Sequence, residues 1–473
     1  MLKFRGLYCY SDKFSAYSEY LSNNYVWYNP LDLTDCISLY EEGKLYGGLL
    51  DDVASVCKIN LPENTSIPPN FDIFKFTHRE NQNEAVTELL KHYRGIIEAS
   101  PGVGKTVMIS DICSRLNNKK ILILSENNKP FQQIKNTLAD ACPSLNVSLY
   151  GDGKTDLSGD IVVGMRQSVV NINNDDFFDS IDVIIVDECH HGVTTSYRKI
   201  YEKCVNCERL YGVSATPYRD DELNDLLLPI FGKIRYTISY GQAIEANMLC
   251  PMVLILEDVP VKEYPEPSYT ANRKMYDALT NSVIQVEVPL SNYAITMKKR
   301  EHYKYVHDDY IMRNVERNLK GVNFARNLNK QNKSCVIIVS KINHANEIHK
   351  IMPEAVVLHG QCNQKYKDEV YKKLYNKEIL TVISTLFDEA VDIKTLDGVA
   401  IMAAGKSTVK IIQRIRSTRV FEGYINGVYT KKEVGYVYYP VDSTRYFKTQ
   451  SQTCLRMLKK EVNSSPHNKI YKI

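Results

Sequence analysis

Short apolar runs alternate with amphipathic stretches along the middle of this chain. The apolar runs cover residues 95–97, 120–125, 160–164 and 182–186, and apolar positions with helical spacing occur at 107–113 and 129–139. Strands that are buried on both faces give continuous apolar runs, and helices connect neighbouring parallel strands. The pattern therefore predicts an α/β fold built on a parallel sheet.

A second set of apolar runs predicts a second sheet of the same kind. These runs cover residues 334–340, 355–358 and 380–385, with a helix expected from residue 342. Two or three domains are expected for a length of 473 residues, because single domains usually hold about 100–200 residues.

The segments around these two sheets give weaker patterns. Residues 1–75 carry many aromatic side chains but no motif, and the stretch 65–70 is typical of a linker. We expect a small α+β accessory domain here, which either binds nucleic acid or only packs on its neighbour. The predicted segments of the chain are 1–75, 76–258, 259–330, 331–442 and 443–473.

Basic residues gather in two of these segments. Residues 259–330 are rich in Tyr, Lys and Arg and are too long for a bare linker. A hairpin or helical pair that contacts nucleic acid and a solvated charged surface both fit this composition. Residues 443–473 carry seven Lys and Arg against Glu461 alone, which suits either phosphate contacts or a soluble end.

Composition narrows the class of protein. The net charge is only +3 and 44% of residues are hydrophobic, so any nucleic-acid contact must come from local patches. No apolar run has membrane-spanning length, and no signal-peptide pattern occurs at the start. The twelve Cys include one Cys-x-x-Cys, Cys204/Cys207, which we expect to be two buried thiols. A reducing, cytoplasmic setting fits this usage, that of the host if the protein is viral.

The stretch 98–106, Glu-Ala-Ser-Pro-Gly-Val-Gly-Lys-Thr, carries the clearest chemistry. It lies between a predicted strand and a predicted helix, which is the context of a phosphate-binding P-loop. Its glycines let successive N–H groups point at phosphate oxygens, and the helix N-terminus adds positive charge. Lys105 can reach the β and γ phosphates, and the Thr106 hydroxyl can bind Mg²⁺. The expected nucleotide-binding residues are Ser100, Pro101, Gly102, Val103, Gly104, Lys105 and Thr106.

Two polar residues just upstream extend this prediction. Residues 76–86 predict a helix that leads into the P-loop strand. Arg79 and Gln82 would share one face of that helix. A Gln side chain both donates and accepts hydrogen bonds, so Gln82 can match an adenine edge.

Two carboxylates end the apolar run at 182–186. Asp187 is placed to hold Mg²⁺, directly or through a water molecule, and Glu188 is placed to orient or deprotonate the water that attacks the γ-phosphate. His190 can couple this site to other parts of the molecule. Further along, Ser214 and Thr216 can hydrogen-bond both the carboxylates and a neighbouring domain.

The order of these motifs resembles that of the superfamily 2 helicases and translocases. The form Asp187-Glu188-Cys189-His190 and the compact length are similar to the branch that includes XPB and the phage UvsW-type recombination helicases. Within that branch the chain is most similar to the branch-migrating helicases of T5-like phages. The resemblance covers about residues 76–440. It implies two tandem RecA-like lobes, with ATP and Mg²⁺ as cofactors.

The resemblance also assigns residues in the second lobe. Residues 388–393 resemble motif V, with Val391 in place of the usual Gly, which implies that Thr385 touches a nucleic-acid phosphate and Asp392 the ribose or the interlobe network. Residues 413–419 resemble motif VI without its Gly, beginning at Gln413, which the resemblance implies takes part in coupling or nucleic-acid contact. By resemblance, Arg416 and Arg419 would reach the γ-phosphate as arginine fingers.

Together these features imply an ATP-driven motor on nucleic acid. The first reading is a DNA helicase that acts on forks and Holliday junctions in replication, recombination and repair. A duplex translocase that displaces bound protein, such as a stalled polymerase, and a P-loop ATPase switch without strand separation stay open. DNA is the expected partner, RNA is not excluded, and a monomer is expected.

Overall fold

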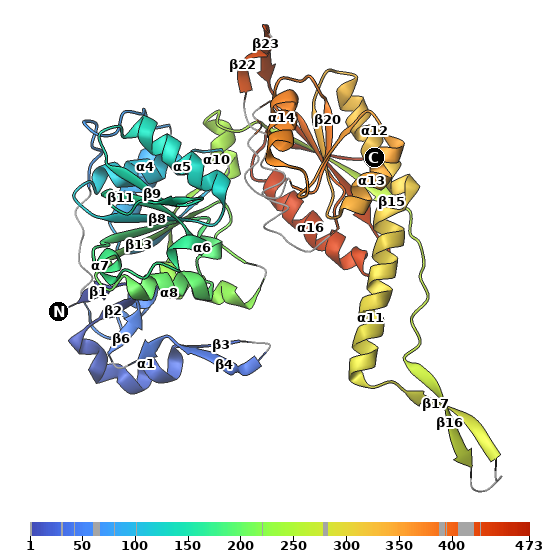
Figure 1. Ribbon diagram of the computed structural model, residues 1–473, viewed down its shortest axis with the longest axis horizontal. Helices are drawn as coiled ribbons and strands as arrows, with labels where there is room; N and C mark the ends of the chain where they lie inside the picture. The colour runs from blue at the N-terminus through green and yellow to red at the C-terminus, as the bar shows by residue number, and fades with distance from the viewer. Residues whose placement is uncertain are drawn as a thin grey trace. The chain divides into compact units, whose positions relative to one another are not determined.

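The structure is a computed structural model of the chain (Figure 1). It describes residues 2–29, 32–41, 43–59, 67–79, 81–100, 102–219, 221–277, 282–386, 393, 395–404, 421–425 and 427–473. The chain forms two compact units, Met1–Leu249 and Cys250–Ile473. Among the described residues, no helix is both long enough and apolar enough to span a bilayer.

An eight-stranded sheet forms the centre of the first unit. Its strand order is β10-β9-β11-β8-β12-β13-β7-β14, and every neighbouring pair is parallel except β10 with β9. The two strands at its middle, β8 and β12, are buried at every position, as the continuous apolar runs predict. The strands are β7 (Arg94–Ala99), β8 (Ile121–Ser125), β9 (Val147–Gly151), β10 (Lys154–Thr155), β11 (Ile161–Met165), β12 (Val183–Asp187), β13 (Arg209–Ser214) and β14 (Ile234–Ile238).

Helices connect these strands, as parallel pairing requires. The helix predicted at 129–139 is present as α5, and the P-loop helix is α4 (Figure 1). The helices are α3 (Gln82–Leu90), α4 (Lys105–Arg115), α5 (Asn128–Ala141), α6 (Arg166–Val169), α7 (Asp175–Asp179), α8 (Thr195–Lys203), α9 (Leu227–Phe231) and α10 (Tyr240–Glu245), with 3-10 turns η3 (Cys189–His191) and η4 (Glu222–Leu226).

The N-terminal region belongs to the same compact unit as this sheet. Its small antiparallel sheet has the order β1-β2-β6-β5, and β3 pairs with β4 in a separate hairpin. Its hydrophobic side chains form one continuous core with those under β12 and α8, including the buried Cys204 and Cys207. The elements are β1 (Lys3–Arg5), β2 (Tyr8–Tyr10), η1 (Asp12–Tyr17), α1 (Ser18–Asn24), β3 (Val26–Asn29), β4 (Asp32–Ser38), β5 (Tyr40–Glu41), β6 (Lys44–Tyr46), η2 (Gly47–Leu49) and α2 (Leu50–Val53).

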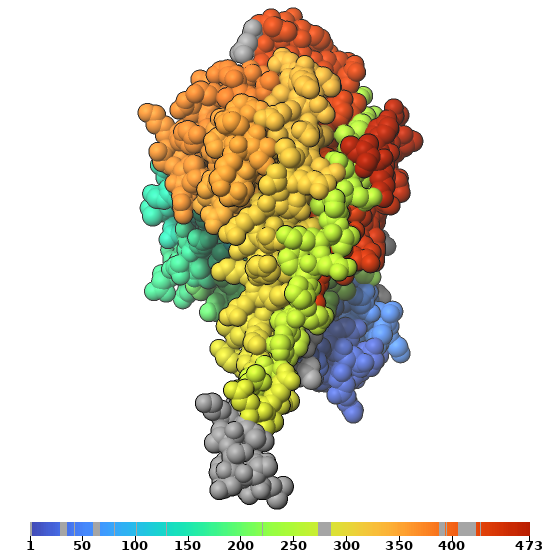
Figure 2. Space-filling model, turned by 90° about the vertical axis from the view of Figure 1, so that its right-hand side faces the viewer, coloured from blue at the N-terminus to red at the C-terminus, as the bar shows by residue number. Residues whose placement is uncertain are grey.

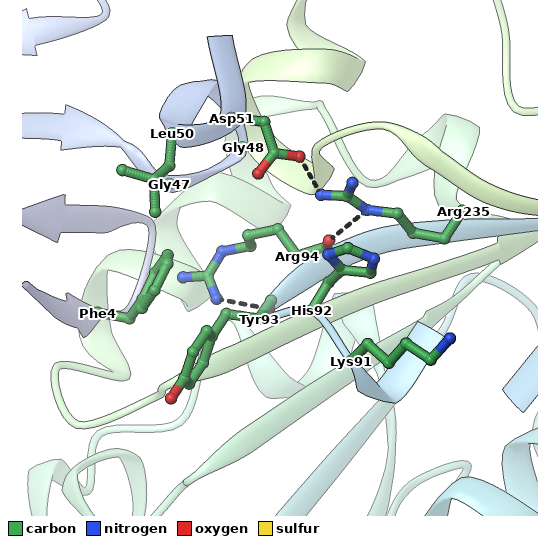
Figure 3. Close-up of a pocket in the computed structure, with 10 residues that line it drawn as sticks. All are labelled: Phe4, Gly47, Gly48, Leu50, Asp51, Lys91, His92, Tyr93, Arg94 and Arg235. Atoms are coloured by element: carbon green, nitrogen blue, oxygen red, sulfur yellow. Dashed lines mark hydrogen bonds and ion pairs between the residues drawn. The ribbon is translucent and has the colours of Figure 1, made fainter. Parts of the chain in front are cut away.

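Arg94 joins the N-terminal region to the large sheet (Figure 3). Its guanidinium group is almost fully buried and donates to the carbonyl oxygens of Gly6 at 2.6 Å and Glu208 at 2.6 Å. The ring of Phe4 lies 4.9 Å from the same group. These contacts hold strand β1 against the start of β7.

The second unit contains a seven-stranded parallel sheet of order β19-β20-β18-β21-β24-β15-β25. β15 (Met252–Val259) lies almost entirely in the segment 76–258, which was predicted to form the first lobe, but it pairs with β24 and β25 of this sheet. β25 and the preceding helix α16 lie in the 443–473 segment. The strands are β15 (Met252–Val259), β18 (Cys335–Ile338), β19 (Val356–Leu358), β20 (Thr381–Ser384), β21 (Gly398–Ile401), β24 (Gly435–Asp442) and β25 (Lys469–Lys472), with the helices α12 (Val315–Asn329), α13 (Ile342–Ile351), α14 (Gln364–Tyr375) and α16 (Phe447–Val462) and the hairpin β22 (Phe421–Ile425)–β23 (Val428–Lys432).

The segment 259–330 forms both a hairpin and helices. The antiparallel strands β16 (Thr270–Asp277) and β17 (Ser282–Pro289) are followed by α11 (Asn292–Val306) and by the π-helical segment η5 (His307–Met312). The hairpin and most of α11 extend away from the sheet of the second unit, whereas α12 packs on it (Figure 1).

One buried ion pair fastens α12 to the end of β24. Arg317 donates from Nε to Asp442 Oδ1 at 2.9 Å and from Nη2 to Oδ2 at 3.0 Å, and its Nη1 donates to the carbonyl oxygen of Met402 at 2.9 Å. Both charged side chains are nearly inaccessible to solvent. Such a pair matters most when one partner is removed, because the other charge then stays buried and unpaired.

We therefore expect Asp442→Asn to lower the free energy of unfolding of the second unit by about 3–5 kcal/mol. The matched control is Glu354→Gln, which breaks the exposed Arg326–Glu354 pair and should cost less than about 1 kcal/mol. Thermal and urea unfolding of both variants measures the difference. Equal losses in the two variants would contradict the role given to the buried pair.

Candidate nucleotide site

The P-loop follows β7 and leads into α4. Gly102 and Gly104 adopt φ angles of 92° and 91°, a region that side chains disfavour. Gly104 caps α4, and a Cβ on it would lie 2.5 Å from Gln82 Nε2. Ser100 and Val103 are buried in the turn. The loop therefore has the backbone shape that aims N–H groups at an anion, while the predicted Pro101 lies outside the described residues.

Gln82 lies against this loop but not on the predicted helix face. Its Nε2 donates to the carbonyl oxygen of Val103 at 2.6 Å, and its Oε1 accepts from the backbone N–H of Arg79 at 2.8 Å. The expected helix over 76–86 is wrong in its first half, because α3 begins only at Gln82. Asn81 has φ 66°, which breaks the helical path. Arg79 thus lies before the helix and contacts Gln82 through its backbone.

The two predicted carboxylates lie at the end of β12, next to the P-loop. Lys105 Nζ forms an ion pair with Glu188 Oε1. Register explains this proximity, because Asp187 pairs with Val213 on β13 and Ser214 pairs with Glu98 on β7. The parallel strands therefore bring their carboxyl ends to one edge of the sheet.

Ser214 organises the other side of Glu188. Its hydroxyl donates to Glu188 Oε2 at 2.9 Å and accepts from the backbone N–H of Thr216 at 3.1 Å. His190 Nδ1 lies 3.1 Å from the same hydroxyl. A serine hydroxyl has one hydrogen to donate, so His190 must donate from Nδ1 to Ser214. The predicted group of Glu188, His190, Ser214 and Thr216 is thus brought together.

The two neighbouring carboxylates differ in their electrostatic surroundings. Burial and the adjacent Glu188 raise the pKa of Asp187 to about 7. Burial also opposes ionisation of Glu188, but Lys105 and His190 outweigh it and lower its pKa to about 2. Glu188 also has φ 53°, an unusual backbone angle for a residue with a side chain. Strain of this kind occurs where surrounding contacts hold a residue in place.

The residues at this edge fit a magnesium ion by their chemistry. Mg²⁺ prefers oxygen ligands and usually takes one or two from protein, with the rest from water and phosphate. Asp187 offers a carboxylate and Thr106 a hydroxyl. A bound cation would also offset the effects of burial and of Glu188, which both oppose ionisation of Asp187. In the part of the chain that the structure describes, no larger cluster of His, Cys, Asp and Glu could hold a metal.

Of the residues predicted to act in the second lobe, Thr385 alone lies among the described residues. Thr385 follows β20, and its backbone N–H donates to the carbonyl oxygen of Leu358 at 3.2 Å. The predicted Asp392, Gln413, Arg416 and Arg419 lie outside the described residues. Their roles stay predictions.

Comparison with known proteins agrees with this arrangement. Residues 75–219 match the family model described as "Type III restriction enzyme, res subunit". "Putative helicase 22" of Sulfolobus islandicus filamentous virus is 26% identical over 394 residues, which cover 78% of this chain and 64% of that protein. The DNA 3'-5' translocase XPB2 of Sulfurisphaera tokodaii is 23% identical over 375 residues, covering 76% and 82%. The chain is thus similar to superfamily 2 helicases over most of its length.

A solved structure supports the fold of this chain. A DNA-bound ATP-dependent Type ISP restriction-modification enzyme, LlaBIII, superposes with a TM-score of 0.53 at 17% identity, covering 88% of this chain and 32% of that one. The expected pair of RecA-like lobes is confirmed. The chain spans less than two thirds of the length of the viral relative.

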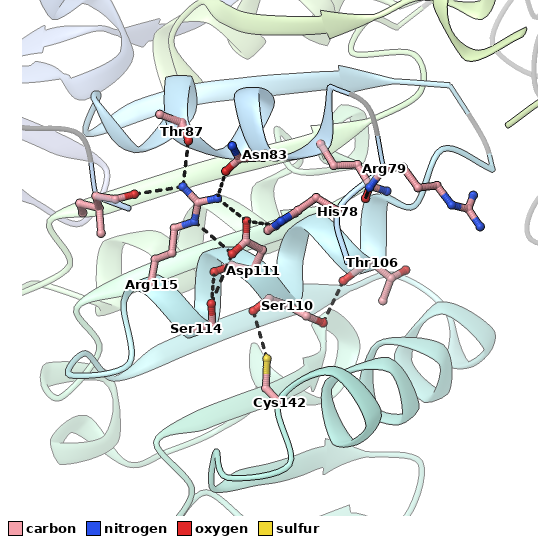
Figure 4. Close-up of polar contacts among 12 residues, drawn as sticks. His78, Arg79, Asn83, Thr87, Thr106, Ser110, Asp111, Ser114, Arg115 and Cys142 are labelled. Atoms are coloured by element: carbon pink, nitrogen blue, oxygen red, sulfur yellow. Dashed lines mark hydrogen bonds and ion pairs between the residues drawn. The ribbon is translucent and has the colours of Figure 1, made fainter. Parts of the chain in front are cut away.

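A buried ionic network supports the P-loop helix from behind (Figure 4). Arg115 donates from Nε to Asp111 Oδ1 at 3.0 Å, and His78 Nε2 lies 2.8 Å from Asp111 Oδ2. Arg115 also donates to the carbonyl oxygen of Ile67 at 3.0 Å. The network ties the segment 67–79 to α4. Sequence reasoning missed it, although the i, i+4 spacing of Asp111 and Arg115 is a usable signal.

A second missed pair lies at the carboxyl ends of β8 and β11. Arg166 donates from Nε and Nη2 to Glu126 at 3.0 and 2.7 Å. Its Nη1 also donates to Ser196 Oγ at 3.2 Å. Charged residues that directly follow buried strands were the available signal, since such strand ends collect at one edge of a parallel sheet.

We expect Asp111→Asn to speed amide exchange in residues 67–79 by about tenfold, equivalent to about 1.4 kcal/mol. The reason is that Arg115 would lose its buried carboxylate partner and hold Ile67 and His78 less firmly. Hydrogen–deuterium exchange with mass spectrometry measures this. Asp140→Asn on α5, which is exposed, is the control and should leave exchange unchanged. Unaltered exchange in Asp111→Asn would show that other contacts anchor the segment.

Proposed function

We propose that this protein is an ATP-dependent DNA helicase or translocase that acts on branched DNA, including forks and Holliday junctions, in phage-type replication, recombination and repair. The observation that carries the proposal is the chain of contacts Lys105–Glu188–Ser214–His190. It connects Lys105 of the phosphate-binding loop to Glu188, the carboxylate that would activate water, and through Ser214 to His190. The contacts of His190 would therefore change with those of Lys105 and Glu188.

Lys105 and Glu188 would exchange partners when nucleotide binds. The γ-phosphate of ATP would compete with Glu188 for the ammonium group of Lys105, since both are anions. Glu188 would then be released to orient the attacking water, while the Ser214 hydroxyl keeps it in position. Lys105 and His190 lower the pKa of Glu188 in the structure, so this carboxylate is ionised before nucleotide binds.

Magnesium would supply charge neutralisation at the phosphates when bound. Asp187 and the Thr106 hydroxyl are the residues that would hold it. Gln82 would contribute to nucleotide recognition through its position over Val103. In the second lobe, Arg416 and Arg419 would add positive charge at the γ-phosphate, and Thr385, Asp392 and Gln413 would take part in coupling.

Ser214 and His190 would pass the state of the nucleotide to the rest of the molecule. Loss of the γ-phosphate would return Lys105 to Glu188 and change the hydrogen bonds of Ser214. The backbone N–H of Thr216 and the carbonyl oxygen of His190, which accepts from Arg219 at 2.7 Å, would move with it. This change acts as a switch only if the protein has two conformations and the bound nucleotide favours one of them.

DNA is the preferred partner in this proposal. One relative is named a DNA 3'-5' translocase, and the restriction enzyme of similar fold is bound to DNA. Contacts to the nucleic-acid backbone do not depend on sequence, so selection by branch structure is expected. The name of the translocase relative also favours a second candidate, a duplex translocase that displaces bound protein.

The first test separates phosphate binding from hydrolysis. Lys105→Ala should abolish DNA-stimulated ATP hydrolysis and weaken nucleotide binding, because the cation that holds the phosphates is gone. Glu188→Gln should keep nucleotide binding and lower the hydrolysis rate by about 10²–10⁴-fold. Fluorescent ATP titration and phosphate release measure the two effects.

Lys135→Ala, an exposed position on α5, is the control and should behave as the unaltered protein. Intact hydrolysis in Lys105→Ala would show that the active site is assigned to the wrong residues.

The second test identifies the nucleic acid. ATP hydrolysis should rise most with forked and four-way DNA, less with single-stranded or duplex DNA, and least with RNA. Strand-displacement and junction-migration assays then distinguish a helicase from a duplex translocase, which would displace a bound protein block without separating strands. Hydrolysis that no nucleic acid stimulates would instead indicate an ATPase switch.

A further inference from the structure

Helix α11 carries a row of exposed side chains that combines apolar and basic groups. Tyr293 is 77% exposed and Met297 is 38% exposed, and Arg300 and Lys304 are also exposed. Their spacing of four, three and four residues places all four on one face of the helix. We call this set the α11 ridge. At 1.5 Å per residue it is about 16 Å long.

The two cations of the ridge have no anionic partner among the described residues. Arg300 and Lys304 form no ion pair there, and like charges four residues apart disfavour a helix. The two other cations of the helix behave differently. Lys298 donates to the carbonyl oxygen of Ser268 at 3.0 Å, and Lys299 lies 5.6 Å from the ring of Tyr269. Half of the positive charge of α11 is therefore directed outward.

The opposite face of α11 holds the helix in place. His302 Nδ1 lies 2.8 Å from the hydroxyl of Tyr446, and the ring of Tyr303 lies 5.8 Å from that of Phe447. Val306 is fully buried. The helix is thus fastened on one side only, and the segment around residue 300, yellow in Figure 2, lies open on the surface.

The segment η5 connects this helix to the second sheet. Asp308 Oδ1 pairs with Lys341 at 3.0 Å, and Lys341 caps α13 just after β18. Asp309 pairs with Lys262 at 2.5 Å. Both carboxylates of this segment are therefore engaged, and Asp308 contacts the residue that begins α13 after β18.

We propose that the α11 ridge binds single-stranded nucleic acid. Tyr293 would stack on an unpaired base, with Met297 beside it, and Arg300 and Lys304 would contact phosphates. Single strands are favoured because stacking on an aromatic ring needs an exposed base face, which a duplex hides. Neither contact depends on base identity, so the site tolerates any sequence. The proposal rests on the proposed function and names where the separated strand would be held.

The test compares two matched double variants in the second unit. Tyr293→Ala with Lys304→Ala removes one exposed tyrosine and one exposed lysine from the ridge. Tyr366→Ala with Lys372→Ala removes the same pair of groups from α14, where both are exposed. Fluorescence anisotropy with a labelled oligo(dT) and with a duplex of equal length measures binding by the full chain at one fixed salt concentration.

The ridge variant should bind oligo(dT) about tenfold more weakly, which is the scale of one lost stacking contact and one lost phosphate contact. Binding to duplex should change less than about threefold, and the α14 variant should bind both as the unaltered protein does. Tyr293→Phe keeps the ring and should retain oligo(dT) binding. An unchanged thermal unfolding midpoint of the ridge variant separates loss of these contacts from misfolding.

Unchanged oligo(dT) binding in the ridge variant, or an equal loss in the α14 variant, would overturn the proposal. Equal losses on oligo(dT) and duplex would overturn the assignment to single strands. If the unaltered protein binds no nucleic acid at all, the proposed function itself fails, which is a different result from failure of the ridge.

Discussion

The ion pair between Lys105 and Glu188 depends on three parallel strands that end at the same level. β7 delivers the P-loop, β12 delivers the acidic pair, and β13 lies between them and delivers Ser214. Each strand must be buried on both faces to hold this register, which is why the chain shows continuous apolar runs before each motif. The contacts among Lys105, Glu188 and Ser214 therefore depend on how the carboxyl ends of these three strands are aligned. A slip of one residue in β12 would turn its side chains to the opposite face.

Local motifs were predictable from the sequence because each depends on few neighbours. The P-loop, the acidic pair and the seven strands that the apolar runs predicted fall where their patterns place them, although the two sheets hold eight and seven strands. The orientation of Gln82 was not predictable in this way, because it depends on the left-handed backbone of Asn81 and on a carbonyl oxygen of the loop. No periodic pattern contains that information.

The C-terminal segment shows a different limit of sequence reasoning. Its basic residues predicted either phosphate contacts or a soluble end. The structure shows instead that α16 buries Phe447, Cys454 and Leu458 on one face. Their spacing of seven and four residues is a helical pattern that was visible in the sequence. β15 was harder to assign, because pairing with β24, about 180 residues away, leaves no local signal. Long-range pairing of this kind is decided by the whole sheet.

The N-terminal region illustrates how a segment without motifs can still be integral to a fold. A Cβ on Gly48 would lie 2.1 Å from the carbonyl oxygen of Leu228, so backbone packs directly on backbone there. Lys233 and Arg235 of the large sheet also pair with Asp52 and Asp51. Since the packing and the ion pairs act together, this region and the eight-stranded sheet are expected to unfold as one unit.

The π-helical segment η5 has a consequence for how the second unit can vary between relatives. A π-turn holds one residue more than an α-turn, and each residue of a helix turns the chain by about 100°. Because the wider turn accommodates the extra residue, deletion of a single residue within His307–Met312 would restore α-helical geometry and leave α11 in nearly the same orientation. The hairpin and the ridge would then keep their direction, whereas a deletion within the α-helical part of α11 would turn the residues before it by about 100°. The π-helical segment is thus a place where the chain can change its length by one residue without turning the arm.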